Sequence, residues 1–249
     1  MSLPNRILML LSLLAGGLLL ALPGARADDK AAASQPPPKG AMVLFNGKDL
    51  SGWETRNGKP AAWKVQDGYM EIAAGTGDIR TKETFGPDFK LHVEFWLPLM
   101  PTAKGQARAN SGVFLQGRYE IQVLDSYMND TYANGSVGAL YGIIAPNKEA
   151  QQKAIRPPQT WQTYDITFHA PRVDNKGKVT EKGQVTVVLN GVAIIKDGPF
   201  DHTTGGAINN KIGEKGPILL QDHHNKGGGP NVRYRNIWLL PLGGAAGTK

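Results

Sequence analysis

The sequence predicts an all-β fold in which two antiparallel sheets pack as a sandwich or jelly roll. Three observations support this prediction. Apolar residues recur at every second position in several segments, four Asn-Gly dipeptides mark tight turns, and no stretch beyond the N-terminal segment keeps a helical period. Many short strands joined by turns are typical of sandwiches and barrels.

The longest candidate strand covers residues 89–97. All five odd positions there are apolar, whereas the even positions are Lys90, His92, Glu94 and Trp96. Such alternation places one side of a strand in a core and the other in solvent. Further candidate strands, rich in Val, Ile, Thr and aromatic residues, are 118–123, 163–170, 184–189, 218–222 and 232–240.

The Asn190-Gly191 dipeptide predicts the clearest turn. It separates the runs VTVVL and VAII. A type I′ turn needs a positive φ at both central residues, which Asn and Gly adopt more readily than other residues. We therefore expect a two-residue hairpin at this point.

The first 27 residues are predicted to be a signal peptide. Arg6 supplies a basic start, 7–22 is apolar, and Ala25-Arg26-Ala27 is a small-x-small pattern that predicts cleavage before Asp28. An uncleaved anchor is the alternative, but this apolar run is shorter than the ~20 residues that span a membrane. We expect an exported protein, periplasmic or extracellular, with no stable membrane insertion after cleavage. The rest of the chain is divided into a Pro-rich linker, one domain and a flexible tail, at 28–40, 41–242 and 243–249.

Composition narrows the possible chemistry. The chain has no cysteine, which excludes disulfides, a thiolate nucleophile and Cys-ligated zinc. Its net charge of +7 is dispersed without a basic run, so nucleic acid is not an expected partner.

Several motifs together carry a family resemblance. They are LFNGKDLSGWE at 44–54, NSGVFLQGRYEIQVLD at 110–125, GALYG at 138–142, GPILLQDHHN at 216–225 and VRYRNIWLLPL at 232–242. In this order the motifs resemble the secreted bacterial 3-keto-disaccharide hydrolase family, over roughly 43–242. The resemblance implies a concanavalin A-like jelly roll whose concave sheet binds sugar. It also implies cleavage of the glycosidic bond in a sugar already oxidised to a ketone at C3.

Alternation gathers polar side chains that suit a sugar-binding groove. If Tyr119 and Ile121 enter the core, their neighbours Arg118, Glu120 and Gln122 face outward. Aromatic faces stack on sugar C–H surfaces, and planar polar groups pair with hydroxyls. The alternative is an ordinary solvated sheet face. The residues predicted to bind substrate are Glu94, Trp96, Asn110, Gln122, Asp125, Tyr141, Gln221 and Arg235.

The chemistry of a 3-keto-sugar assigns the catalytic roles. The ketone acidifies the proton on C2, so a base there allows the group at C1 to leave by β-elimination, and hydration of the enone completes hydrolysis. Glu120 and His223 are the candidate base and acid, in either order. Arg118, or alternatively Arg235, is the candidate cation that stabilises the enolate.

Other functions stay open at the level of sequence. A lectin-like module would keep the groove without turnover, and a structural envelope protein is a further option. A family 16-like glucanase is suggested by Glu120-x-Gln122-x-x-Asp125, although two positions depart from its ExDxxE pattern. No cofactor is required by the sequence. His223 and His224 point to opposite faces of a strand and cannot chelate one metal together. A divalent metal such as calcium remains possible without assigned ligands, because lectin-like jelly rolls often hold one.

Overall fold

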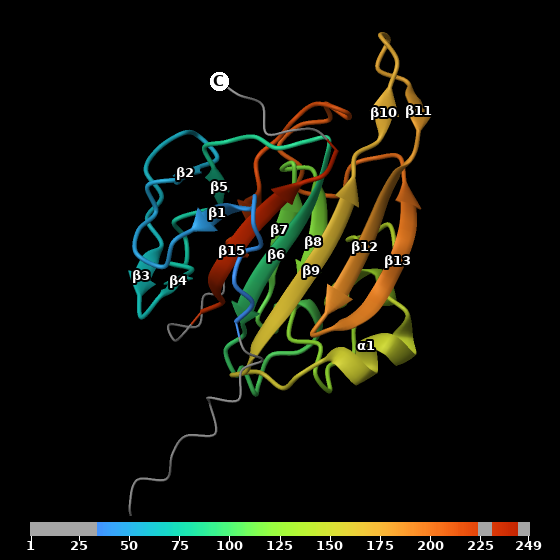
Figure 1. Ribbon diagram of the computed structural model, residues 1–249. Helices are drawn as coiled ribbons and strands as arrows, with labels where there is room; N and C mark the ends of the chain where they lie inside the picture. The colour runs from blue at the N-terminus through green and yellow to red at the C-terminus, as the bar shows by residue number, and fades with distance from the viewer. Residues whose placement is uncertain (1–33, 224–230, 244–249) are drawn as a thin grey trace, which may run out of the picture.

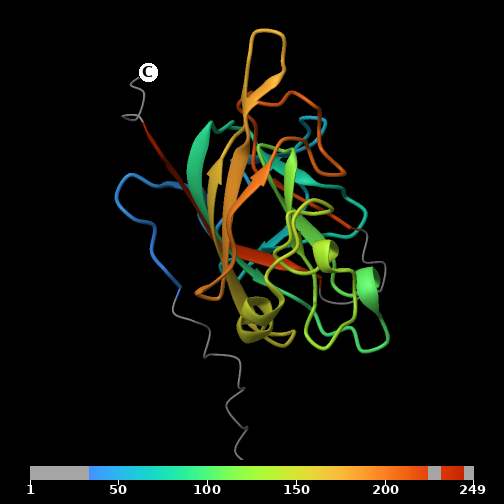
Figure 2. The ribbon, with the colours of Figure 1, turned by 90° about the vertical axis from the view of Figure 1, so that its right-hand side faces the viewer.

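The computed structural model describes residues 34–223 and 231–243 as two antiparallel sheets packed face to face (Figures 1 and 2). The predicted all-β sandwich is confirmed. The predicted signal peptide, its cleavage site, His224 and the last residues of the tail lie outside the described residues. None of the helices in the described part is long and apolar enough to span a membrane.

The larger sheet has eight strands in the order β13-β12-β9-β6-β15-β4-β3, and β1 also pairs with β15. Its strands are β1 (Met42–Phe45), β3 (Lys64–Gln66), β4 (Tyr69–Glu71), β6 (Asp88–Trp96), β9 (Trp161–His169), β12 (Gly183–Leu189), β13 (Val192–Phe200) and β15 (Arg233–Pro241). All of its strand pairs are antiparallel.

The smaller sheet has five strands in the order β2-β5-β14-β7-β8. They are β2 (Trp53–Thr55), β5 (Ile79–Thr81), β7 (Ser111–Leu115), β8 (Tyr119–Val123) and β14 (Leu219–Leu220). A separate hairpin, β10 (Arg172–Val173) with β11 (Val179–Glu181), projects from the body (Figure 1). Within the described residues the helical segments are η2 (Gly105–Ala107), η3 (Ala133–Gly135) and α1 (Lys148–Ala154).

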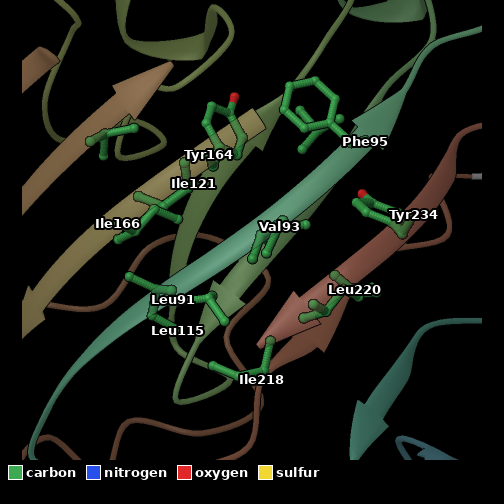
Figure 3. Close-up of a cluster of buried hydrophobic side chains, with 14 of the residues drawn as sticks. Leu91, Val93, Phe95, Leu115, Ile121, Tyr164, Ile166, Ile218, Leu220 and Tyr234 are labelled. Carbon is green, nitrogen blue, oxygen red and sulfur yellow. The ribbon is translucent and has the colours of Figure 1, made fainter. Parts of the chain in front are cut away.

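The core lies between the two sheets (Figure 3). Leu91, Val93 and Phe95 of β6 face it from the larger sheet, and Leu115 and Ile121 face it from the smaller one. Each large apolar side chain that is fully buried contributes about 1.5–3 kcal/mol. The alternation read from the sequence therefore assigns these side chains correctly to the interior.

The predicted Asn190-Gly191 hairpin is confirmed. Asn190 and Gly191 have φ values of 49° and 84°, and Leu189 of β12 pairs with Val192 of β13. Both central residues thus adopt the left-handed conformation that the type I′ turn requires.

Two elements differ from expectation. The strand predicted over 218–222 is limited to β14, because the backbone amides of Ile218 and Asp222 donate to the side chains of Thr81 and Asp78 and not to a neighbouring strand. Helix α1 was not predicted, since its seven residues are too few to display a helical period. Its start is nevertheless marked in the sequence by Asn147, whose side chain accepts from the amide of Ala150 at 2.9 Å.

Candidate active site

Glu120 lies at the centre of a buried polar cluster on the outer face of the smaller sheet. Its neighbours in β8, Tyr119 and Ile121, face the core, so Glu120 turns away from it. Its side chain is nevertheless only 4% exposed. Loops cover β8 at this point: the Glu120 amide donates to Thr204 Oγ1, and the Glu120 carbonyl accepts from the Tyr141 amide.

Gly112 on the neighbouring strand β7 makes room for the Glu120 side chain. A Cβ atom at position 112 would lie 2.3 Å from Glu120 Oε1 and 2.9 Å from Glu120 Cγ and Cδ. The φ of Gly112 is not in the left-handed region. A glycine is therefore needed here because the Glu120 side chain lies close to the backbone of β7, and not because the backbone conformation is unusual.

The surroundings keep Glu120 protonated at neutral pH. Burial raises the pKa of Glu120 to about 8, and the negative charge of Asp78 acts in the same direction, while Arg56 opposes both. A carboxyl group in this state can donate a proton at pH 7, as general acids of glycoside-cleaving enzymes do.

Asp78 and Arg56 form the charged side of the cluster. Arg56 Nε donates to Asp78 Oδ2 at 2.5 Å, and its Nη2 donates to the Gly206 carbonyl at 2.9 Å. The other oxygen of Asp78 accepts from the Asp222 amide at 2.8 Å. This ion pair therefore joins three segments, namely the loop that carries Asp78, the segment that carries Asp222 and the loop that carries Gly206.

Two amide side chains border Glu120. The Gln122 nitrogen, in the orientation that best satisfies its surroundings, donates to Glu120 Oε1 at 3.3 Å and to the Ser111 carbonyl at 3.0 Å. Gln221 is held beside Gly112, because its backbone amide donates to the Gly112 carbonyl. Among the described residues the buried Gln221 Oε1 has no hydrogen-bond partner. A hydroxyl group of a ligand would satisfy this acceptor.

A tyrosine pair closes one end of the cluster. The hydroxyls of Tyr132 and Tyr141 lie 2.6 Å apart. This hydrogen bond, together with burial and the charges of Tyr132 and Glu120, raises the pKa of Tyr141 to about 12. Tyr141 therefore stays protonated and offers a hydrogen-bonding group and an aromatic face.

The guanidinium of Arg118 bonds to a loop, and the described residues show no contact between it and Glu120. Arg118 precedes β8, after a turn in which Gln116 and Gly117 have positive φ values. Its guanidinium is 1% exposed and donates to the Glu214 carbonyl and to Asn209 Oδ1. It thus fixes the 209–214 loop, and the cation that acts on Glu120 is Arg56.

Asn110 and Asp125 brace loops beside the cluster. Asn110 Nδ2 donates to the carbonyl of Gln106 at 2.8 Å. Asp125 is 1% exposed and accepts from Arg108 Nε at 2.7 Å. The Asp125 carboxylate is thus engaged with Arg108 on one oxygen and with the Tyr127 amide on the other.

The grouping of Glu94, Trp96 and Arg235 with Glu120 in one groove is wrong. All three lie on β6 or β15 of the larger sheet and turn away from the core, so the whole sandwich separates them from Glu120. Arg235 Nε donates to Glu94 at 2.6 Å, and the guanidinium of Arg233 lies 4.2 Å from the Trp96 ring centroid. Alternation predicts which side chains point away from the core, but it does not predict to which of the two sheets their strand belongs.

His92 is the centre of this second polar cluster, on the outer face of the larger sheet. Its Nδ1 lies 2.7 Å from Asp165 Oδ1, its Nε2 lies 3.6 Å from Glu94 Oε1, and its ring stacks on Trp238. Burial by itself lowers the pKa of His92. The hydrogen bonds with Asp165 and Glu94 outweigh burial and raise the pKa to about 8.

Residues 34 and 35 of the predicted linker lie on this second cluster. The Gln35 carbonyl accepts from Asn236 Nδ2 at 2.9 Å. Burial would raise the pKa of Glu94, but hydrogen bonds with His92, Asn236 and Ser34 lower it to about 2. This part of the predicted linker is exposed, and it is also tied to the sheet.

The second cluster should make stability depend on pH. The pKa of His92 is above its unfolded value of 6.5, so its contribution is present below pH 6.5 and is lost as pH rises through about 8. The loss amounts to about 2 kcal/mol. Thermal unfolding of the parent and His92→Gln at pH 6 and pH 9 checks this. The parent should lose more stability than the variant, and equal losses would contradict the assignment.

His223 is exposed directly after Asp222, at the edge of the Glu120 cluster. The described residues show no contact between His223 and Glu120. Within residues 34–223 and 231–243, no three His, Asp or Glu side chains are arranged to hold a metal ion. A calcium site therefore stays a prediction without assigned ligands.

Sequence reasoning missed Arg56, Asp78, Tyr132 and Thr204. Arg56 and Asp78 adjoin β2 and β5, which have three residues each and are too short to show a period of two. The signal that was available for Tyr132 is its place just before the Asn134-Gly135 turn.

The molecule is therefore a jelly-roll sandwich that carries the buried polar cluster around Glu120 on the outer face of its smaller sheet. The family described as the 3-keto-alpha-glucoside-1,2-lyase-like domain matches residues 40–240. The chain belongs to this family of carbohydrate-active proteins, as the sequence motifs predicted.

Solved structures agree with this assignment. A crystal structure from Parabacteroides distasonis, provisionally described as a glycosyl hydrolase, is 41% identical with a TM-score of 0.73, and the match covers 82% of this chain and 85% of that one. A second protein of that organism with the same description is 20% identical with a TM-score of 0.57, over 82% of this chain and 94% of that one. At this identity the second likeness shows the fold alone. No protein of curated function matches the chain.

Proposed function

We propose that this protein cleaves the glycosidic bond of sugars that carry a ketone at C3. The observation that carries the proposal is the buried, protonated Glu120 among hydrogen-bonding side chains on one sheet face. Membership of the 3-keto-alpha-glucoside-1,2-lyase-like family supports the substrate class.

In the proposed reaction Glu120 is the acid. A base removes the C2 proton, and the electron pair of that bond forms the enolate with the C3 ketone. Collapse of the enolate breaks the bond from C1 to the leaving oxygen, and Glu120 protonates this oxygen. Water then adds to C1 of the enone with Glu120, now ionised, as its base, and C2 regains a proton. One water is consumed and one glycosidic bond is broken.

His223 is the proposed base, and Arg56 is the proposed source of positive charge. His223 lies at the edge of the cluster, and histidine is the side chain that most often acts as a general base in enzymes. Arg56 acts electrostatically on Glu120, so its charge also favours an enolate formed nearby. Gln122, Gln221 and Tyr141 would position hydroxyl groups.

Exchange of the C2 hydrogen tests the proposal and separates the two roles. A methyl 3-keto-glucoside is incubated in heavy water with each protein, and deuterium at C2 is measured by mass spectrometry against a buffer control. We expect exchange and cleavage with the parent, exchange with little cleavage for Glu120→Gln, and neither for His223→Ala. Cleavage by the parent without deuterium at C2 would overturn the elimination mechanism.

One observation favours a second candidate, direct hydrolysis of an unoxidised glycoside. The cluster holds a protonated carboxyl group, Glu120, and a carboxylate, Asp78, paired with Arg56. Glycosidases usually act with a pair of carboxyl groups that flank the scissile bond. An unoxidised methyl glucoside, assayed beside the 3-keto-sugar, distinguishes the candidates, because only direct hydrolysis would cleave it.

A further inference from the structure

A hollow of about 500 Å³ lies beside the Glu120 cluster, between the 126–131 loop and helix α1. This volume is within the range of small-molecule sites. The side chains around it are hydroxyl, amide and apolar groups, with one acid and one base, Asp130 and Lys148. A lining of this kind suits a neutral ligand that has many hydroxyl groups and apolar C–H faces.

The loop wall of the hollow is held rigidly. Asn129 bonds to both backbone groups of Gly105, at 2.8 and 3.1 Å, and to the Asp125 carbonyl at 2.7 Å. The Tyr127 amide donates to Asp125 Oδ1 at 3.1 Å, and its carbonyl accepts from Arg108. These bonds fix the backbone on both sides of Tyr127 before any ligand binds.

This rigid loop presents apolar side chains to solvent. Tyr127 is 38% exposed and Met128 is 88% exposed. Met128 also has a φ of 49°, a left-handed conformation that costs a non-glycine residue about 1 kcal/mol or more. The loop therefore exposes Tyr127 and Met128 although this costs conformational free energy. A contact with a ligand would offset that free energy.

The two walls are joined to each other and to the Glu120 cluster. Gln151 of α1 donates to Ser136 Oγ at 2.8 Å and to the Val137 carbonyl at 2.6 Å, and the Val137 amide donates to Ser126 Oγ of the loop at 3.0 Å. Turn η3 separates the two sites. Ala133 lines the hollow, whereas Tyr132, just before the turn, bonds to Tyr141 beside Glu120.

We propose that this hollow is an accessory subsite that binds a neutral sugar unit of an oligosaccharide, separate from the unit that is cleaved at Glu120. This inference rests on the proposed function. Tyr127 supplies the stacking face, and Met128 covers the edge of the sugar. Gln152 and Lys148 lie exposed on α1 and are available to hydroxyl groups.

Binding is measured by calorimetry with unoxidised maltotetraose and cellotetraose, using the Glu120→Gln variant so that no turnover interferes. Adding Tyr127→Ala to this variant should raise the Kd of whichever tetrasaccharide binds more tightly about tenfold, which is the scale of one lost aromatic contact. Met128→Ala should also weaken it. Met42→Ala is the matched control, because Met42 is an exposed methionine on β1 of the larger sheet, and it should change nothing.

The outcomes separate this inference from the proposed function. Tetrasaccharide binding that depends on Tyr127, in a protein that does not cleave 3-keto-sugars, would support the subsite and reject the proposed reaction. No binding of either tetrasaccharide, binding unaffected by Tyr127→Ala, or an equal loss in Met42→Ala would overturn the subsite. Adding Tyr127→Ala, Met128→Ala or Met42→Ala should leave the melting temperature of the Glu120→Gln protein unchanged, since these three side chains are exposed.

Discussion

Replacing Glu120 by Gln should lower turnover of a 3-keto-glycoside by at least ~10²-fold, the scale of a lost general acid. Gln has nearly the same shape and keeps a hydrogen-bonding group beside Gln122, but it has no proton to give to the leaving oxygen. In the parent, kcat/KM should fall as pH rises through about 8, because the pKa of Glu120 is raised to that value, chiefly by burial. A rate that instead rises through pH 8 would identify Glu120 as the base.

The same variant should not be less stable. The pKa of Glu120 is raised above its unfolded value of 4.5, so its favourable contribution is present below pH 4.5 and is lost as pH rises through about 8. The Glu120→Gln variant does not lose this stability as pH rises, because glutamine does not ionise. We expect Glu120→Gln to melt at a higher temperature than the parent at pH 9 and at a similar temperature at pH 4. An inactive variant that melts well below the parent at pH 9 would show a structural role.

Replacing Gly112 by Ala should lower turnover by about 10²-fold, because displacement of a catalytic group by about 1 Å can cost that much. The new Cβ would lie 2.3 Å from Glu120 Oε1 and 2.9 Å from Glu120 Cγ, so the whole side chain must move. The backbone φ of Gly112 suits alanine. The effect should therefore fall on activity, with a stability loss of about 1–3 kcal/mol from overpacking.

Gly205→Ala is the matched control for this substitution. Gly205 belongs to the loop that carries Thr204, and a Cβ there would meet no atom within 4 Å. It should leave turnover unchanged. If Gly112→Ala keeps full activity, the position of the Glu120 carboxyl group is not important for catalysis.

The sequence allowed the core to be predicted more completely than the site. The alternation in 89–97 and around Ile121 identifies side chains that the structure buries, because a period of two is set by the strand itself. Glu120 and Gln221 were correctly expected to share a sheet face. Arg56 and Asp78 were not expected, since only the pairing order β2-β5-β14-β7-β8 brings them to Glu120. Pairing order depends on contacts between distant segments, which no local pattern records.

Strand β15 has a consequence for how the chain folds. It is the last strand of the described residues, yet it lies inside the larger sheet, paired with β6 on one side and with β1 and β4 on the other. In the described residues no other strand connects β1 and β4 to β6. Pairing between segments so far apart in the chain is slow, because closing the long loops comes before the stabilising contacts. A nascent chain therefore cannot complete its larger sheet until residues 233–241 have been synthesised.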